Sequence, residues 1–229
     1  TRRQYFRREA NKLEKFESIL TEAQHILAIS PADATDLSHR YRNVEHVMAF
    51  HSNGEVLSKT GIGNFAFYHG NLEVGENNQA ALFLVNEVFR SLDYPLVIAG
   101  NNPSPELIAA AAELKNVTLK ANIDTVEIDQ LITDAHVNVL PTFQATGIKL
   151  KLLAALFNGR HCLVNASMVA NTGVESLCVI REDASSMRNE IMELKNKEFS
   201  QLEIDARKVA LNEKFSNRIN AEKILALLK

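Results

Sequence analysis

The residues best suited to chemistry lie between residues 143 and 158, in the stretch FQATGIKLKLLAALFN. A polar loop there brings Thr146, Gly147, Lys149 and Lys151 to the start of a strongly apolar predicted helix. The first N–H groups of a helix are unpaired, and the helix dipole adds about half a positive charge there. Gly147 would let a phosphate approach the backbone, Thr146 offers a hydroxyl, and the lysines offer cations. The pattern therefore indicates a phosphate site, although a capped helix with two solvent-facing lysines would give the same pattern.

A second group of polar residues follows a predicted strand, in the stretch YHGNLEVGENN at residues 68–78. It places His69, Gly70 and Asn71 where the strand ends. A glycine at that point suits the close approach of a ligand, and it suits a plain turn equally well. His69 is compatible with a ligand contact or with a purely structural role.

The segments that must position these residues alternate between short apolar runs and amphipathic stretches. Strands are predicted at residues 25–30, 44–50, 65–70, 95–100, 117–122, 137–142, 161–165 and 177–180. Helices are predicted at residues 2–23, 31–42, 77–92, 104–114, 126–135 and 147–158. Alternating strands and helices predict an α/β fold, a Rossmann-like parallel sheet with helices on both faces. Ligands of such sheets bind at the carboxyl ends of the strands, where the polar loops lie.

The composition is that of an ordinary soluble globular protein, with 46% hydrophobic and 23% charged residues. The formal net charge of -3 argues against a nucleic-acid partner, which would call for a basic surface. Cys162 and Cys178 lie in apolar runs, so we expect buried free thiols in a reducing cytoplasm.

The sequence patterns of several common nucleotide-binding and metal-binding sites do not occur in this chain. No G-x-G-x-x-G follows a strand and no G-x-x-x-x-G-K-[ST] occurs, which argues against dehydrogenases and P-loop enzymes. The seven histidines show no metal-ligand spacing, so we expect neither a metal nor another cofactor.

Four segments are predicted along the chain. Residues 51–63 are polar and contain glycine, as linkers do, and they separate residues 1–50 from a Rossmann-like domain at residues 64–200. Residues 201–229 form C-terminal helices that are expected to pack back on the N-terminal part. Because Thr1 falls within a predicted helix, we expect the chain to be part of a longer protein.

With its loops in this order, the chain resembles the group 1 GT-B glycosyltransferases, a family-4-like group. FAFYHGNLEVGENNQAALFLVNEVF is similar to the stretch that opens their donor domain, and PLVIAGNNPSPEL to their "l-x-i-x-G-x-x-P". VNVLPTFQATGIKLKLLAALFNGRHCLVN resembles the motif "P-x-x-x-G-t-(K/R)-x-K-x-L-E-A" with its following strand. The resemblance implies the C-terminal donor-binding domain of a GT-B fold, preceded by the end of the N-terminal acceptor domain.

The family's site residues carry over to this chain as expectations. The resemblance implies that the donor diphosphate is bound by Thr146, Gly147, Ile148, Lys149 and Lys151. It implies that His69, Gly70 and Asn71 approach the sugar or phosphate, and that the backbone at Asn122 and Ile123 reads the base. The catalytic residues are not assigned.

Four positions depart from the family pattern. Two glutamates eight positions apart are usual, and here they are Thr146 and Ala154, so the carboxylate expected at the ribose is absent. Asn71 and Glu76 stand where many relatives have a phosphate-binding arginine and lysine.

The resemblance implies transfer of a sugar from a nucleotide-sugar donor to a carbohydrate or lipid-linked acceptor, in polysaccharide or glycoconjugate synthesis. The chain alone is expected to be inactive, because catalysis needs both halves of the cleft. A cytoplasmic location is expected. The basic start of the chain is typical of a solvated helix face, and it is also compatible with contact to anionic lipid at the inner face of the membrane. The alternatives are a degenerate GT-B-like domain with a binding or regulatory role, and a related nucleotide-sugar enzyme such as an epimerase.

Overall fold

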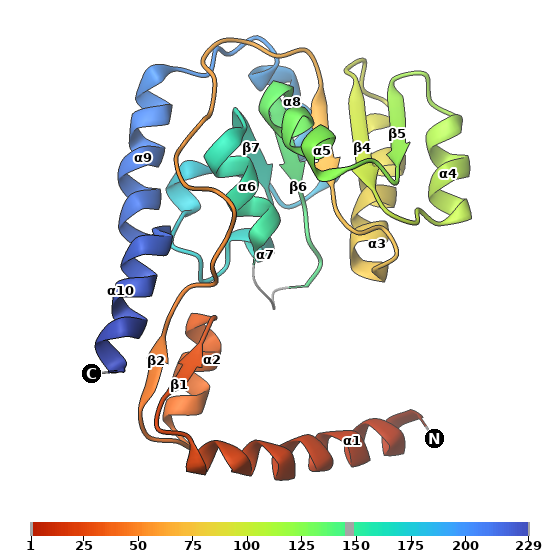
Figure 1. Ribbon diagram of the computed structural model, residues 1–229. Coiled ribbons are helices and arrows are strands. Elements are labelled where there is room, and N and C mark those ends of the chain that lie inside the picture. Colours follow the sequence, from red (N-terminus) through yellow and green to blue (C-terminus); the bar gives the residue numbers. More distant parts are fainter. Residues whose placement is uncertain (1, 145–148, 229) are drawn as a thin grey trace. The chain divides into compact units, whose positions relative to one another are not determined.

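The computed structural model describes residues 2–144 and 149–228, and it divides into two compact units. The first unit contains the residues up to Phe50 and those from Asn217 onward, and the second runs from His51 to Ser216. Figure 1 shows the elements of both units.

The smaller unit is built around two short parallel strands, β1 (Ile26–Ala28) and β2 (Val44–His46). The helix between them, α2 (Pro31–Ser38), begins as predicted: the Ser30 hydroxyl accepts a hydrogen bond from the N–H of Asp33 at 3.4 Å. The other elements of this unit are α1 (Arg2–Glu17), the 3-10 helix η1 (Ser18–Glu22) and α10 (Asn217–Leu227).

The larger unit contains a six-stranded parallel sheet, in the spatial order β5-β4-β3-β6-β7-β8. Its strands are β3 (Ala66–His69), β4 (Leu96–Gly100), β5 (Val117–Ala121), β6 (Val137–Leu140), β7 (His161–Val164) and β8 (Val179–Ile180). The residues of β6 and β7 are all buried. The continuous apolar runs predicted this burial, because strands covered on both faces have such runs. The Rossmann-like α/β fold expected from the sequence is confirmed.

The helices of this unit form two groups. The helix pairs α3–α4 and α8–η2 are in contact, as are α5–α6 and α6–α9. In chain order the helical elements are α3 (Gly75–Phe83), η2 (Leu84–Phe89), α4 (Pro105–Ala112), α5 (Thr125–Asp134), α6 (Leu150–Asn158), α7 (Ala166–Val169), η3 (Glu175–Leu177), α8 (Ala184–Leu194) and α9 (Gln201–Phe215). The predicted helix at 77–92 is thus an α-helix that continues as one π-helical segment, η2.

The order of the strands creates a switch point between β3 and β6. The chain moves from β3 outward to β4 and β5, and then returns to β6 on the other side of β3. The loops that follow β3 and β6 therefore diverge at the carboxyl edge of the sheet, which is where open α/β sheets bind ligands.

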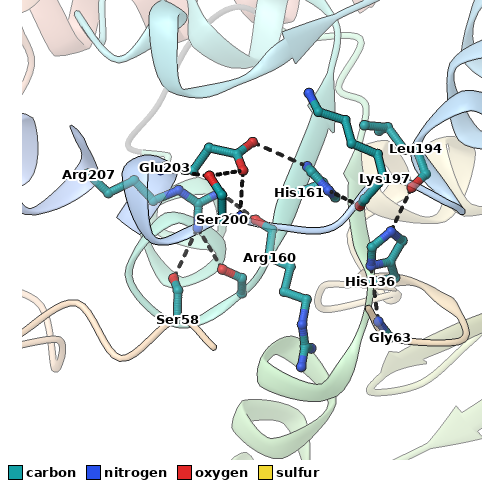
Figure 2. A network of polar contacts seen from close by, with 11 residues as sticks. Ser58, Gly63, His136, Arg160, His161, Leu194, Lys197, Ser200, Glu203 and Arg207 are labelled. Carbon is teal, nitrogen blue, oxygen red and sulfur yellow. Dashed lines mark hydrogen bonds and ion pairs between the residues drawn. The ribbon is translucent and has the colours of Figure 1, made fainter. Parts of the chain in front are cut away.

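A buried arginine of α9 holds the C-terminal end of α6. The Arg207 guanidinium donates hydrogen bonds to the carbonyl of Leu156 at 3.1 Å, to that of Gly159 at 2.6 Å and to that of Arg160. It also donates to the Ser58 hydroxyl at 3.1 Å, as Figure 2 shows. Because the last carbonyls of a helix have no partner within the helix, Arg207 satisfies groups that would otherwise be buried without hydrogen bonds. It fixes the helix that carries Lys151 at its other end.

The segment predicted to be a linker, residues 51–63, lies along the larger unit. Gly61 and Phe199 exchange two backbone hydrogen bonds, of 2.9 and 3.1 Å. The N–H of Gly63 donates to Nδ1 of His136 at 3.1 Å, and Nε2 of that ring lies 2.7 Å from the Leu194 carbonyl (Figure 2). Since Nδ1 accepts, Nε2 must carry the proton, and the ring is neutral.

Candidate functional site

The candidate site lies at the switch point between β3 and β6, the place where open α/β sheets bind ligands in a crevice. It contains the loop after β3, the described part of the loop after β6, and the first turns of α3 and α6, and we call it the crevice below. Both lysines predicted for the phosphate site lie in the described part of it. Thr146, Gly147 and Ile148 fall outside the described residues, so the expectation for these three rests on the sequence.

Lys151 crosses the crevice from α6 toward α3. Its Nζ donates a hydrogen bond of 2.6 Å to Oδ1 of Asn77 and lies 5.2 Å from the ring centroid of Tyr68. Burial lowers the pKa of Lys151 to about 8; nearby Glu76 opposes this effect, and Lys149 adds to it. A desolvated ammonium of this kind binds an anion more strongly than one in water, because less screening opposes the attraction.

Lys149 immediately precedes α6. Its Nζ donates to the carbonyl of Gln144 at 3.0 Å. Burial lowers the pKa of Lys149, while Glu76 acts in the opposite direction. The two lysines therefore form one electrostatic group with Glu76.

Gly70 leaves room for the side chains of Asn77 and Lys151 in the crevice. A Cβ atom there would lie 3.0 Å from Cγ of Asn77 and 3.2 Å from Nζ of Lys151. A side chain at Gly100 would collide with the Gly70 carbonyl oxygen, at 1.9 Å. These two glycines let the ends of β3 and β4 and the Lys151 side chain come together.

The predicted residue Asn71 stabilises its own loop. Its Oδ1 accepts from the N–H of Glu73 at 3.2 Å, and its carbonyl accepts from Nδ2 of Asn77 at 2.9 Å. The side-chain amide of Asn77 therefore contacts the loop after β3 through Nδ2 and Lys151 through Oδ1.

Glu76 joins the loop after β3 to the loop after β6. Its carboxylate accepts a hydrogen bond from the hydroxyl of Thr142. The side chain of Asn165, at the end of β7, holds Thr142 by both backbone groups: Oδ1 accepts from its N–H at 3.1 Å, and Nδ2 donates to its carbonyl at 2.7 Å. Both Thr142 and Asn165 are buried. The carboxylate thus has a fixed position at the crevice.

His69 is buried next to the crevice. Its ring stacks on Phe67 with centroids 5.5 Å apart, and its Nε2 is buried without a hydrogen-bond partner among the residues that the structure describes. Burial, reinforced by the charge of Lys151, lowers the pKa of His69 to about 3. The ring is therefore neutral at physiological pH.

Asn122 and Ile123 follow β5, two strands away from β3. Asn122 has a left-handed backbone, with φ 57°, and its Oδ1 accepts from the N–H of Asn102 at 3.0 Å. Ile123 and Ala154 both pack against a core cluster that includes Phe67. Ile123 of the predicted base-binding loop and Ala154 at the predicted ribose position thus lie beside the same core cluster.

Residues that sequence reasoning missed complete the site. They are Tyr68, Asn77, Thr142 and Asn165. Thr142 and Asn165 stand at the carboxyl ends of predicted strands, a position that could have pointed to them. Asn77 had no comparable signal, because its contact with Lys151 spans 74 positions of the chain.

The crevice offers two cations, one carboxylate, and amide and hydroxyl groups. This set suits a ligand that carries both phosphates and hydroxyl groups. Among residues 2–144 and 149–228, no group of three or more His, Cys, Asp or Glu side chains is placed to hold a metal ion.

Comparison with known proteins shows which solved structures share this fold. No protein-family model matches the sequence, and no curated protein matches it. Solved structures do match. A mutant of Staphylococcus aureus TarM, solved in complex with UDP, alpha-GlcNAc-glycerol and Fondaparinux, is 15% identical over 94% of this chain and 46% of that chain, with a TM-score of 0.68.

Two further structures are similar. A glycosyltransferase from Rickettsia africae is 11% identical over 96% of this chain and 68% of that chain, with a TM-score of 0.66. The GtfA/B complex is 12% identical over 93% of this chain and 47% of that chain, with a TM-score of 0.64. The chain therefore spans about half the length of TarM and of GtfA/B, and its fold is similar to that of the matching part of these structures.

Proposed function

We propose that this chain is the donor-binding part of a sugar-nucleotide-dependent glycosyltransferase. The observation that carries the proposal is the crevice at the β3/β6 switch point, where Lys151 from α6 meets Asn77 from α3 above Gly70. A desolvated lysine beside a glycine and a helix start suits a diphosphate. The likeness to solved glycosyltransferases supports the same reading of the fold.

In this proposal the donor lies along the carboxyl edge of the sheet. The base contacts the backbone at Asn122 and Ile123, the ribose lies near Ala154, and the diphosphate contacts Lys149 and Lys151. The leaving group is a nucleoside diphosphate, and the two lysines stabilise the charge that develops on it without a metal ion. From the sequence resemblance we assign the backbone amides of Gly147 and Ile148 and the hydroxyl of Thr146 to the same diphosphate.

The acceptor is a carbohydrate or a lipid-linked carbohydrate in polysaccharide or glycoconjugate synthesis. We assign its binding to the part of a longer protein that corresponds to the other half of TarM and GtfA/B. The 229-residue chain alone then binds the donor but does not transfer the sugar.

We also propose a cytoplasmic protein that touches the inner face of the membrane. Cys162 and Cys178 are free thiols, as in a reducing compartment. Helix α1 exposes Tyr5, Phe6 and Phe16 in addition to basic side chains, which suits contact with an anionic lipid surface. No helix in the described part of the chain is long and apolar enough to span a bilayer.

Ligand-induced stabilisation of the 229-residue chain tests the donor proposal. Thermal unfolding is measured with UDP, GDP and ADP and with their sugar conjugates at millimolar concentration. A ligand at 100 times its Kd stabilises the folded state by about 2.7 kcal/mol, which gives a measurable rise in Tm. The expected result is a rise with the nucleotides of one base, reduced in Lys151→Ala. No shift with any of the ligands would contradict the proposal.

A further inference from the structure

The carboxylate of Glu76 has a position that its place in α3 does not require. Glu76 is the second residue of α3, where an acidic side chain complements the helix dipole. Glu106 is the second residue of α4 and complements that helix equally well, while its side chain is exposed. Glu76 is instead half-buried and hydrogen-bonded to Thr142 in the loop after β6. The helix dipole therefore does not account for its placement.

The surroundings of Glu76 are those of a phosphate site. Its charge raises the pKa of both Lys149 and Lys151 against the effect of burial, so it lies within electrostatic reach of each. A carboxylate close enough to influence both lysines also repels a diphosphate that contacts them. Its presence weakens phosphate binding unless it also makes a favourable contact with the ligand.

A carboxylate accepts hydrogen bonds and donates none. One oxygen of Glu76 accepts from Thr142, and hydroxyl groups of a ligand are suitable donors to the other. Hydrogen bonds between hydroxyls and an ionised carboxylate are among the strong ones. The crevice therefore favours a ligand in which hydroxyl groups follow the phosphates.

The order of the strands indicates which part of the donor carries the hydroxyl groups that reach Glu76. In the proposed function, which this inference presupposes, the base lies beyond β5 and the diphosphate at the lysines between β3 and β6. The sugar must then continue past the diphosphate, toward the ends of β6 and β7. Thr142 follows β6 and Asn165 follows β7, and these two residues fix the position of Glu76.

We infer that Glu76 is a specificity-determining residue whose carboxylate accepts hydrogen bonds from hydroxyl groups of the transferred sugar. It selects the glycosylated nucleotide over the bare nucleoside diphosphate. It does so by weakening the binding of the diphosphate and strengthening the binding of the attached sugar.

The test is the ratio of two affinities in each variant. Isothermal titration calorimetry on the 229-residue chain gives the Kd of UDP, GDP and ADP, and of UDP-glucose, UDP-N-acetylglucosamine, GDP-mannose and ADP-glucose. Glu76→Gln keeps the shape and removes the charge. For the conjugate that binds best, its affinity should fall at least tenfold, while the affinity for the matching bare diphosphate should stay equal or rise. Glu106→Gln, at the same position of the neighbouring helix, should leave both affinities unchanged.

A second variant distinguishes a contact between Glu76 and the ligand from a purely structural role of Glu76 in holding the loop after β6. Thr142→Val removes the hydroxyl that bonds to Glu76 and leaves the carboxylate in place. If Glu76 contacts the sugar, Thr142→Val should weaken the conjugate less than Glu76→Gln does, and it should not strengthen the bare diphosphate, because the carboxylate is still present. If Glu76 only holds the loop, both variants would weaken conjugate and diphosphate by the same factor, and the inference would be wrong.

The remaining outcomes are also decisive. Equal strengthening of both ligands in Glu76→Gln would mean that the carboxylate acts on the phosphates alone, which overturns the inference and leaves the proposed function intact. Binding of diphosphates with no binding of any conjugate would overturn the inference and would also count against the proposed sugar-nucleotide donor. Absence of binding by every nucleotide to the unmodified chain would overturn the proposed function itself.

Discussion

The Nζ atom of Lys151 lies 2.6 Å from Oδ1 of Asn77, and this contact joins the first turn of α6 to that of α3 across the crevice. The amide at the same time donates from Nδ2 to the Asn71 carbonyl, at 2.9 Å. Lys151 is thereby held over the end of β3, half-buried, with its ammonium pointing into the place expected for a diphosphate. A solvent-facing lysine would have to be ordered by the ligand, whereas this one is already in position.

Removal of the Lys151 charge should weaken nucleotide binding strongly. Hydrogen bonds to charged groups contribute about 1.5 to 3 kcal/mol, so Lys151→Ala should raise the Kd of the nucleoside diphosphate about tenfold to a hundredfold. Titration calorimetry measures the change. Lys115→Ala is the control, because Lys115 is exposed on the loop between α4 and β5. A Kd that stays within twofold in Lys151→Ala would mean that the diphosphate does not contact this lysine.

The lowered pKa of Lys151 predicts a pH dependence for binding. Only the ammonium form attracts phosphate, and the pKa of about 8 in the free protein means that this form becomes scarce above pH 8. The Kd should therefore rise as the pH increases from 8, by up to about tenfold per pH unit. Binding measured from pH 7 to 9.5 checks this. Lys151→Arg keeps its charge over that range and should give a flat profile; an equally steep profile in that variant would assign the titration to another group.

The sequence predicts the fold because the decisive patterns are local. The apolar runs at 137–142 and 161–165 predict buried strands, and the alternation with helices predicts the parallel sheet. The exact ends depend on tertiary contacts: the strand predicted at 44–50 extends only over Val44–His46, and the helix predicted at 147–158 begins at Leu150. The π-helical segment Leu84–Phe89 has no sequence pattern that would have shown it.

Part of the site was predictable because it too depends on local sequence patterns. Lys149, Lys151 and Gly70 are evident from their positions at a helix start and a strand end. The partners of Lys151 and Glu76 are not, because the contacts with Asn77 and Thr142 join residues 74 and 66 positions apart. Such contacts follow from strand order, which a local pattern does not specify.

Ala154→Glu should tighten nucleotide binding if the ribose lies beside this position. Ala154 packs against the cluster of Phe67 and Ile132, on the same α6 helix as Lys151. A carboxylate there would accept hydrogen bonds from the ribose hydroxyls, and one such bond corresponds to a roughly tenfold lower Kd. A 2′,3′-dideoxynucleoside diphosphate is the control and should show no gain. An unchanged or higher Kd for the ordinary nucleotide, in a variant that keeps its Tm, would place the ribose elsewhere.

Arg207→Met should destabilise the protein without altering the crevice directly. The substitution keeps the length of the side chain but leaves the carbonyls of Leu156, Gly159 and Arg160 without this donor in a buried place. An unsatisfied buried polar group costs about 1 to 3 kcal/mol, so the free energy of unfolding should fall by about 3 kcal/mol or more. Urea denaturation measures it, and Lys208→Met, at the exposed neighbouring position, should change it by less than about 0.5 kcal/mol. A loss below 1 kcal/mol for Arg207→Met would show that water replaces the guanidinium.

Buried histidines should make the protein unstable in acid. Burial lowers the pKa values of His69, His136 and His161 from 6.5, and that of His69 reaches about 3. Between the folded and unfolded pKa values the unfolded chain binds more protons, so stability is lost as the pH falls below 6.5. Each histidine contributes about 1.4 kcal/mol per pH unit within its own window. Urea denaturation at pH 7.5, 6.5, 5.5 and 4.5 should show this slope, and His69→Leu should reduce it, whereas His25→Leu, at an exposed position, should not. An identical slope in His69→Leu would mean that His69 becomes protonated without unfolding.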